Sequence, residues 1–228
     1  MSFRKTSAFF ITDQCLFGSY PTQIQIEELE EWGVDIIVNL TKQGEKKIEP
    51  YITSKKLIHF EISDNSVPES KKIPQFFSLI IYLVKMINSG KKIYIHCKGG
   101  HGRSGVLVAC IFCYKYNMKV SQSLYMTNQC HLTRSVHARR PHMNNYWISK
   151  GSPQTETQKK FVIDMFWPYK INRSPVGDMQ RFQEVGDRKK IDEILKTTNL
   201  RPIIGDDGNL ITDIQKYRDS LIYNLFSW

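Results

Sequence analysis

The stretch 93–105, which reads IYIHCKGGHGRSG, constrains the fold of this 228-residue chain more than any other segment. It runs from an apolar, alternating pattern through Cys97 into a loop with three glycines, and then through Arg103 into the apolar run 106–113. Glycines allow a backbone to turn tightly, and a helix that is apolar on all sides is buried. The stretch therefore predicts a strand, a tight turn and the start of a buried helix.

The loop between Cys97 and Arg103 has the composition of an anion-binding site. The N-terminus of a helix leaves backbone N–H groups without partners and carries a partial positive charge. Gly99, Gly100 and Gly102 let these N–H groups point toward one spot. The arginine can donate two hydrogen bonds to two oxygens of a phosphate group. We therefore expect the loop to hold a tetrahedral oxyanion.

Cys97 is the candidate nucleophile, because the positive field at the end of the strand favours its thiolate form. His96 and Ser104 flank it, and the Ser104 hydroxyl can donate to the sulfur when the sulfur becomes a leaving group. A cysteine or a glycine-rich turn alone would indicate only packing or a turn. Their combination with Arg103 at this spacing indicates attack on a phosphate. A Walker-type nucleotide loop is excluded, because its Gly-Lys-Ser/Thr ending is missing.

The segment 96–105, HCKGGHGRSG, resembles the signature loop of the cysteine-based protein tyrosine phosphatases, in their dual-specificity branch. The resemblance covers residues 8–168 approximately, and it implies neither a metal nor a cofactor. It implies that Cys97 attacks phosphorus, that Arg103 holds the phosphoryl oxygens and that Ser104 assists hydrolysis of the phospho-cysteine. It also implies that the remaining loop residues contact the substrate, namely His96, Lys98, Gly99, Gly100, His101 and Gly102.

Such chemistry needs an acid that protonates the leaving oxygen, which is usually a carboxylate on a mobile loop. The alternating segment 57–62 predicts a strand, and residues 63–69 have the composition of a loop. Asp64, with a proline four residues later, resembles the acid loop of the kinase-associated and mitotic-exit dual-specificity phosphatases, so we expect it to be the general acid. Glu61 and Glu69 are its competitors. Without the loop at residue 97, Asp64 would be interpreted as a turn former.

A third motif, GSPQTETQ at 151–158, resembles the glutamine loop of the same family, in which an amide positions the attacking water. Gln154 and Gln158 are both candidates for this role. From the residues alone, Thr155 and Gln158 form a capping box that opens a helix. The two interpretations can hold together.

Positive charge is concentrated around the predicted phosphate loop. The chain has 32 Lys and Arg against 22 Asp and Glu, and no acidic residue stands between Glu69 and Glu156. A positive field concentrates anionic substrates near a site. A basic cluster downstream is expected on a loop beside the site, and it is also the usual footprint of contact with RNA or anionic lipid; it consists of Arg134, His137, Arg139, Arg140 and His142.

The order of elements predicts an α/β fold that resembles the dual-specificity phosphatases. Alternating strands and helices indicate a central, mostly parallel sheet flanked by helices, with the phosphate loop at the carboxyl end of a strand. We expect a hairpin over 9–17, strands over 34–40, 57–62 and 93–95, and helices over 24–32, 73–88, 103–116, 121–131 and 155–166. The first of these helices should be capped by Thr22 and ended by Gly33.

We expect a catalytic domain over 1–169 and a C-terminal extension over 170–228, whose role is open and whose pattern predicts helices at 188–197 and 211–225. Five cysteines are no disulfide framework, so a reducing compartment, the cytoplasm or the nucleus, is expected. The longest apolar run, 73–87, contains Lys85 and predicts a core helix, not a transmembrane segment. The first residues lack the apolar core of a secretory signal.

These features predict a metal-independent phosphatase that hydrolyses phosphotyrosine and phosphoserine or phosphothreonine in proteins. A phosphoinositide is an alternative substrate, because Lys98 and the potentially cationic His101 stand where the tensin-like phosphoinositide phosphatases carry lysines. The 5′-triphosphate of RNA is another, although that branch usually carries His and Asn where Gly99 and Gly102 stand. A phosphate-binding module with little activity is the third hypothesis, and the complete set of catalytic candidates speaks against it.

Overall fold

The computed structural model describes residues 1–138 and 141–166, so the predicted extension with its two predicted helices lies outside the described residues. A five-stranded sheet with the order β1-β2-β5-β3-β4 forms the centre of the described part. β1 is antiparallel to β2, and the other neighbours are parallel, which confirms the predicted mostly parallel sheet. The strands are β1 (Ser7–Ile11), β2 (Cys15–Gly18), β3 (Ile36–Asn39), β4 (Lys56–His59) and β5 (Ile93–His96).

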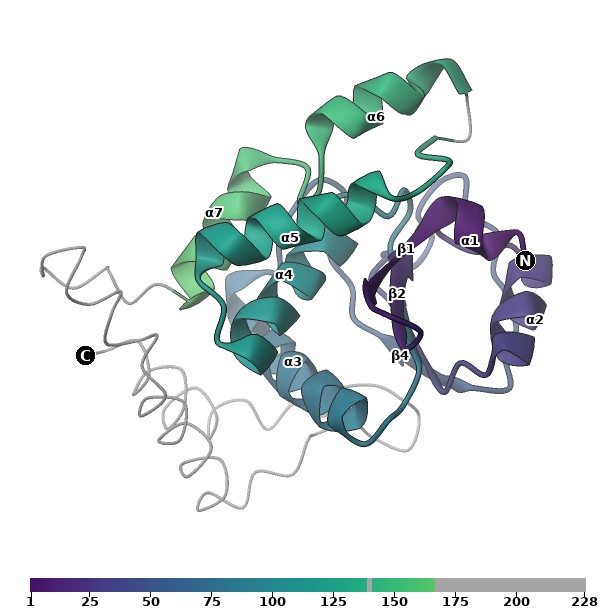
Figure 1. The fold of residues 1–228 in the computed structure, drawn as a ribbon, viewed down its shortest axis with the longest axis horizontal. Coiled ribbons are helices and arrows are strands. Elements are labelled where there is room, and N and C mark those ends of the chain that lie inside the picture. The colour runs from purple at the N-terminus through teal and green to yellow at the C-terminus, as the bar shows by residue number, and fades with distance from the viewer. Residues whose placement is uncertain (139–140, 167–228) are drawn as a thin grey trace, which may run out of the picture.

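Helices cover both faces of this sheet (Figure 1). One face carries α1 (Phe3–Thr6) and α2 (Gln23–Trp32). The other face carries α3 (Ile73–Asn88), α4 (Arg103–Tyr116), α5 (Val120–Leu132) and α7 (Glu156–Phe166). The short helix α6 (Asn144–Lys150) has no buried residue and lies beyond the end of α5, and the two 3-10 turns are Ser70–Lys72 and Pro141–Met143. Sequence analysis missed α1 and α6.

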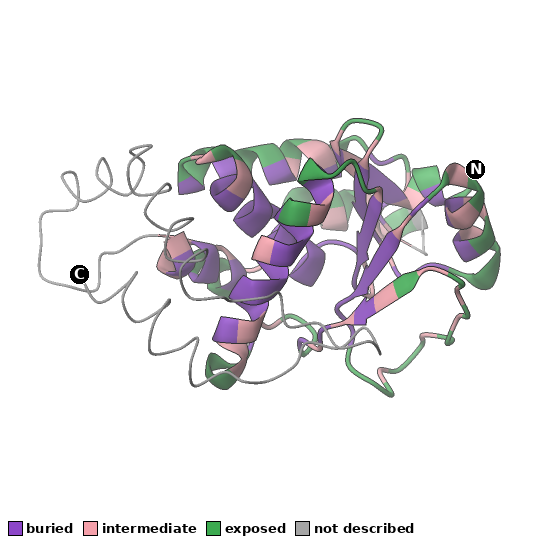
Figure 2. Cartoon of the chain, turned by 90° about the horizontal axis from the view of Figure 1, so that it is seen from below, coloured by how far each residue is buried: buried purple, intermediate pink, exposed green. Residues whose placement is uncertain are grey.

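The alternation of side chains along the central strand β5 divides the interior into two cores. Ile93 and Ile95 pack into the larger core with α3 and α4, whereas Tyr94 packs into the smaller core with α1 and α2. Helix α4 is buried along most of its length. Figure 2 shows that buried residues gather along the strands and on the sides of the helices that face the interior. The apolar run 106–113 therefore needs no polar face, and the N-terminus of α4 opens at the carboxyl edge of the sheet.

The ends of two elements follow from their local chemistry. Helix α2 begins with a capping box between Thr22 and Gln25 and ends at Gly33, whose φ is 92°. Strand β4 is shorter than predicted, but the Phe60 N–H still donates to the carbonyl of Asn39, the last residue of β3, and the Ile62 N–H donates to the carbonyl of Leu40. These bonds lead the chain along the sheet edge and place the loop that follows next to the end of β5. Among the described residues, no helix combines the length and the apolar character that crossing a membrane requires.

Candidate active site

A cavity of about 380 Å³ opens at the carboxyl edge of the sheet, where β5 turns into α4. The phosphate loop predicted from sequence forms one wall of it. The residues that this loop contributes to the wall are Cys97, Lys98, Gly99, His101, Gly102 and Arg103. The loop therefore does surround one hollow, as its glycines and its position before a buried helix predicted.

The Cys97 thiol lies in the wall of this cavity, although only 2% of the residue is exposed. Its Sγ accepts a hydrogen bond from the backbone N–H of Gly100 at 3.2 Å. The Ser104 hydroxyl lies 3.5 Å from the same sulfur, where it can donate. Both contacts suit a negatively charged sulfur. A ligand that enters the cavity is thus placed to meet the nucleophile.

Arg103 is held by carboxylates on two separate loops, and only 1% of the residue is exposed. Its Nη1 donates to Glu45 Oε2 at 2.7 Å and to the Ile62 carbonyl at 3.0 Å. Its Nη2 donates to Glu45 Oε1 at 2.9 Å and to Asp64 Oδ1 at 2.8 Å. Sequence analysis missed Glu45, which forms a bidentate pair with the arginine.

This pairing overcomes the effect of burial on both partners. Burial acts to raise the pKa of the Glu45 carboxyl, but the hydrogen bonds and charge of Arg103 outweigh it and leave that pKa below its ordinary value. Burial acts to lower the pKa of the Arg103 guanidinium, but Glu45, together with the charges of Cys97 and Asp64, raises it above its ordinary value. The arginine is therefore charged and fixed in direction.

Of the three carboxylates considered as the general acid, Asp64 is the one that lines the cavity. The side chain of Glu61 is directed elsewhere and accepts a hydrogen bond from the Gln43 N–H at 2.9 Å. The exposed Glu69 pairs with Lys71 at 3.3 Å. The placement of Asp64 beside the thiol therefore favours it over both competitors.

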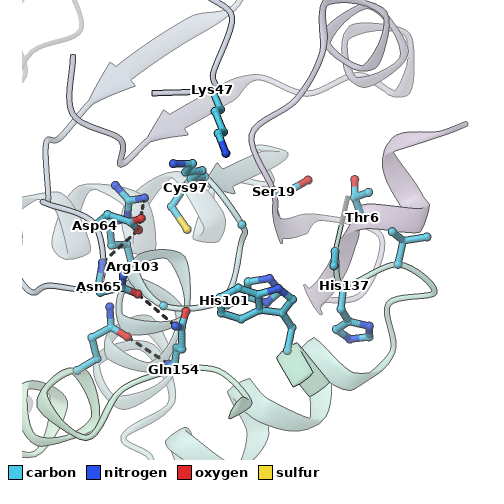
Figure 3. A pocket seen from close by; sticks show the side chains of 17 residues that line it. Thr6, Ser19, Lys47, Asp64, Asn65, Cys97, His101, Arg103, His137 and Gln154 are labelled. Carbon is cyan, nitrogen blue, oxygen red and sulfur yellow. Dashed lines mark hydrogen bonds and ion pairs between the residues drawn. The ribbon is translucent and has the colours of Figure 1, made fainter. Parts of the chain in front are cut away.

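The two candidate glutamines both line the cavity, and both hold the loop that carries Asp64. Gln154 Nε2 donates to Asn65 Oδ1 at 3.1 Å (Figure 3). Gln158 Nε2 donates to the Ser66 carbonyl at 3.0 Å. The predicted capping box is present, because Gln158 Oε1 accepts from the Thr155 N–H at 3.1 Å and the Gln158 N–H donates to the Thr155 hydroxyl at 3.2 Å. The amide of Gln158 is thus engaged within the protein at both its oxygen and its nitrogen.

His96 was predicted to contact the substrate, and for its side chain this prediction is wrong. The side chain is fully buried behind the loop and does not line the cavity. Its Nε2 lies 2.7 Å from the Tyr51 hydroxyl, and its ring stacks on Tyr94 with centroids 5.7 Å apart. Burial lowers the pKa of His96 to about 3, so the ring is neutral. It supports the end of β5.

His101 lines the cavity but does not supply the charge that the sequence suggested. Its Nδ1 lies 2.8 Å from Nε2 of His131, and its ring is parallel to that of Trp147 at 4.9 Å. Burial and the nearby charge of Arg134 lower the pKa of His101 to about 3. The expectation of a second cation in the loop is therefore wrong, and Lys98, 3.8 Å from a Glu45 oxygen, is the cation that the loop itself adds beside Arg103.

The cavity extends beyond the loop in a direction that sequence analysis did not predict. Asp64, Arg103 and Gln154 lie on one side of Cys97 (Figure 3). Ser19, Thr6 and His137 lie on the opposite side. The lining residues to which the sequence analysis gave no role come from separate segments: Thr6, Ser19, Lys47, Val136, Ala138 and Trp147. This part of the cavity gives room for the group that carries a phosphate.

The predicted basic cluster is only partly a surface feature. Arg134 and His137 lie on the segment after α5 beside the cavity, as expected, but both are buried. His142 is exposed, as expected, and Arg139 and Arg140 lie outside the described residues. Two of the five side chains from which a contact with RNA or anionic lipid was inferred are therefore not on the surface.

Comparison with known proteins gives matches over the same region. Residues 14–116 match the family model described as "Tc-R-P: Polymorphic toxin system, DSP-PTPase phosphatase". The chain is 35% identical over 162 residues to protein 067L of Invertebrate iridescent virus 3, which carries the name of a tyrosine phosphatase; the match covers 70% of this chain and 65% of that protein. It is 24% identical over 109 residues to the phosphatidylglycerophosphate phosphatase PTPMT1 of Arabidopsis thaliana, covering 47% of this chain and 32% of that protein.

Among solved structures, a crystal structure of kinase associated phosphatase (KAP) has a similar fold, with a TM-score of 0.50 and 18% identity. The likeness covers 69% of this chain and 90% of that chain.

The fold and the loop define an α/β protein with a cysteine-based phosphate site, and the matches agree with both. Over the matched segments the chain is similar to phosphatases of the DSP-PTPase type and to a viral protein named as a tyrosine phosphatase. It spans less than two thirds of the length of each of the two relatives described above.

Proposed function

We propose that this chain is a phosphatase that hydrolyses phosphotyrosine and phosphoserine or phosphothreonine in proteins through a phospho-cysteine intermediate. One observation supports the proposal above all: Cys97, Arg103 and Asp64 line a single cavity. Displacement at phosphorus requires a nucleophile, a fixed positive charge and an acid for the leaving oxygen. The three side chains provide these functions in that order.

In the first half-reaction, the Cys97 thiolate attacks phosphorus, the bond from phosphorus to the leaving oxygen breaks, and Asp64 gives a proton to that oxygen. Asp64 occupies Nη2 of Arg103 in the structure. A bound phosphate competes for this donor, so substrate binding releases the carboxyl group from the arginine and leaves it free to contact the leaving oxygen. The backbone N–H groups of the loop and the arginine stabilise the charge on the phosphoryl oxygens.

In the second half-reaction, a water molecule attacks phosphorus, the sulfur–phosphorus bond breaks, and Asp64 takes the proton of the water. The Ser104 hydroxyl, 3.5 Å from the sulfur, donates to the departing thiolate. We assign the orientation of the water to Gln154, because both ends of the Gln158 amide already bond to neighbouring groups of the protein. Inorganic phosphate is the product.

The motifs found in the sequence do not include the tyrosine-capping loop of the strictly tyrosine-specific enzymes, which supports a shallower site that admits both kinds of phosphorylated side chain. A lipid phosphate is the second candidate substrate. The Arabidopsis relative is named for such a substrate, and Lys98 lines the cavity. The neutral state of His101 weakens the similarity to the tensin-like enzymes and leaves the protein substrate as the first proposal.

The test uses the full chain in the presence of a chelator, with p-nitrophenyl phosphate as the first substrate. We expect turnover that Cys97→Ser abolishes, and unimpaired turnover by this variant would reject the mechanism. Values of kcat/KM are then compared for a phosphotyrosine peptide, a phosphoserine peptide, a phosphoinositide, phosphatidylglycerophosphate and 5′-triphosphate RNA. Peptides should exceed the others by about tenfold or more, a difference of about 1.4 kcal/mol in transition-state binding. The reverse order would favour the lipid or the RNA.

A further inference from the structure

Arg134, which follows α5, is a buried guanidinium that bridges the phosphate loop and β2, and only 4% of the residue is exposed. Its Nη2 donates to the Gly100 carbonyl at 2.6 Å and to the Phe17 carbonyl at 3.1 Å. The guanidinium carbon also lies 4.7 Å from the centre of the Phe17 ring. The proposed mechanism gives this arginine no role, although it contacts the loop that binds the phosphate.

The residue that Arg134 contacts is the one whose backbone N–H faces the nucleophile. Gly100 donates this N–H to Cys97 Sγ and has a φ of 74°. It packs so closely on β2 that a Cβ atom at this position would lie 2.3 Å from the carbonyl carbon of Gly18. The arginine therefore joins two backbone segments at the point where the loop is most tightly packed.

The two buried arginines near the phosphate loop differ in how their positive charges are paired. A buried charge is costly unless it is paired or hydrogen-bonded. Arg103 pairs with Glu45 and Asp64. Among the residues that the structure describes, no carboxylate pairs with Arg134, and its Nε atom has no hydrogen-bond partner. Its positive charge is therefore left for an anion of the site itself.

The histidines near the loop do not provide a positive charge. Burial lowers the pKa of His101 to about 3 and that of His131 to about 2, so both rings are neutral. Burial likewise keeps His96 neutral. Burial also raises the pKa of Tyr94 on β5, so this tyrosine is not an anion that could pair with Arg134. Lys98 lies 3.8 Å from a Glu45 oxygen.

We propose that Arg134 is a buried positive centre behind the phosphate loop, a positioning residue that holds Gly100 against β2 and stabilises negative charge on Cys97. This inference rests on the proposed role of Cys97 as the nucleophile. Burial lowers the pKa of Arg134 to about 10, against the opposing influence of Tyr94 and Cys97, and this value still leaves the guanidinium charged at neutral pH.

The test compares Arg134→Met, which removes the charge, with Arg134→Lys, which keeps it. Lys92→Met is the matched control, because Lys92 also lies over an aromatic ring, that of Trp32 at 4.6 Å, and also donates to a backbone carbonyl, but that carbonyl belongs to Trp32 and not to the phosphate loop. The rate of Cys97 alkylation by iodoacetamide is measured at pH 6 and pH 9 by peptide mass spectrometry, which separates this thiol from the other four. The values of kcat and KM for p-nitrophenyl phosphate are measured alongside.

We expect Arg134→Met to slow alkylation about tenfold at pH 6 but much less at pH 9, because a neighbouring charge changes the thiolate fraction and not the access to the thiol. Arg134→Lys should alkylate within about twofold of the wild type at pH 6, since the charge remains. Its kcat should still fall about tenfold, because one ammonium group holds two carbonyls less well than a guanidinium does. Lys92→Met should match the wild type throughout.

Equal slowing of both Arg134 variants at both pH values would show a packing role alone and overturn the proposal, as would the absence of any effect. Should circular dichroism show that Arg134→Met does not fold, the lysine variant decides: wild-type alkylation at pH 6 supports the proposal, and a tenfold loss contradicts it. A wild-type protein that is alkylated at pH 6 but hydrolyses no phosphate ester would refute the proposed function and leave the charge effect measurable.

Discussion

The bidentate contact with Glu45 gives the guanidinium of Arg103 a fixed direction. Arginine side chains are long and lose entropy when they are ordered. A carboxylate that receives two parallel N–H groups fixes the plane of the guanidinium as well as its position. The remaining contacts, from Asp64 and the Ile62 carbonyl, occupy the other terminal N–H groups of the same arginine. Substrate binding then has to exchange only the Asp64 contact.

Glu45→Gln tests this contribution, because it keeps the shape of the side chain but removes its charge and turns one N–H₂ group toward the arginine. We expect kcat/KM for an aryl phosphate to fall about 10- to 100-fold, a loss of about 1.4 to 2.7 kcal/mol in transition-state stabilisation. Glu49→Gln is the control, since Glu49 is exposed in the same connection between β3 and β4. Equal kinetics for the two variants would show that the arginine is oriented without Glu45.

The sequence allowed prediction of the residues that one short loop brings together, but not of their distant partners. Cys97 and Arg103 are placed by local geometry, because a strand end, three glycines and a helix start leave few arrangements. Glu45 is 58 residues away from Arg103 and is followed by two lysines, which makes it look like part of a solvated, charged loop. The neutral state of His101 likewise depends on His131 and on Trp147 from α6.

At the scale of elements, the phosphate loop has its shape because it lies directly on the end of β2. A Cβ atom at Gly100 would lie 2.3 Å from the carbonyl carbon of Gly18, and a Cβ atom at Gly18 would lie 2.6 Å from the Tyr94 hydroxyl oxygen, so neither position leaves room for a side chain. The parallel pairing of β2 with β5 fixes the position of the Gly18 backbone. The conformation of the loop is therefore a consequence of the sheet as well as of its own glycines.

Gly100→Ala should disrupt this contact, and Gly90→Ala separates the contact from backbone strain. Both glycines have a positive φ, 74° and 82°, but no atom lies within 4 Å of a Cβ at Gly90. We expect Gly90→Ala to cost about 1 kcal/mol in the free energy of unfolding and to leave kcat/KM unchanged. Gly100→Ala should cost more and reduce kcat/KM at least about 100-fold. Denaturant unfolding and steady-state kinetics check both, and equal behaviour of the two variants would contradict the account.

Elements with clear ends were predictable, and those held by tertiary contacts were not. Thr22 and Gly33 bound α2 as expected, because capping and a positive φ are local properties. Helix α6 has only seven residues and no buried side chain, so its pattern gives no signal. Its place beside the cavity comes from the stacking of Trp147 on His101, which no local pattern encodes.

At the scale of the whole molecule, buried neutral histidines make stability depend on pH. His96, His101 and His131 ordinarily titrate near 6.5, and burial lowers their pKa values to about 3, about 3 and about 2. Below pH 6.5 the unfolded chain binds protons that the folded chain does not, so stability is present above this pH and is lost as the pH falls toward 3. The lowered pKa of Glu45 acts in the same direction at more acidic pH.

We expect the free energy of unfolding to fall between pH 7 and pH 5 by about 2 kcal/mol for each of these histidines. His131→Gln should therefore show a smaller loss between the two pH values than the wild type, whatever its stability at pH 7. The exposed His142 provides the control, and His142→Gln should lose as much as the wild type. Denaturant titrations at both pH values measure the difference, and the same loss in all three proteins would contradict the assignment of His131 as a buried neutral group.

The most direct measurement is the identification of the covalent intermediate. The full chain is mixed with an excess of p-nitrophenyl phosphate, quenched in acid within the first turnovers, and its peptides are analysed by mass spectrometry. The account predicts a phosphate group on the peptide that contains Cys97 in the wild type, and none in Cys97→Ser. Turnover that leaves a phosphate on a different residue, or that continues in the serine variant, would contradict it.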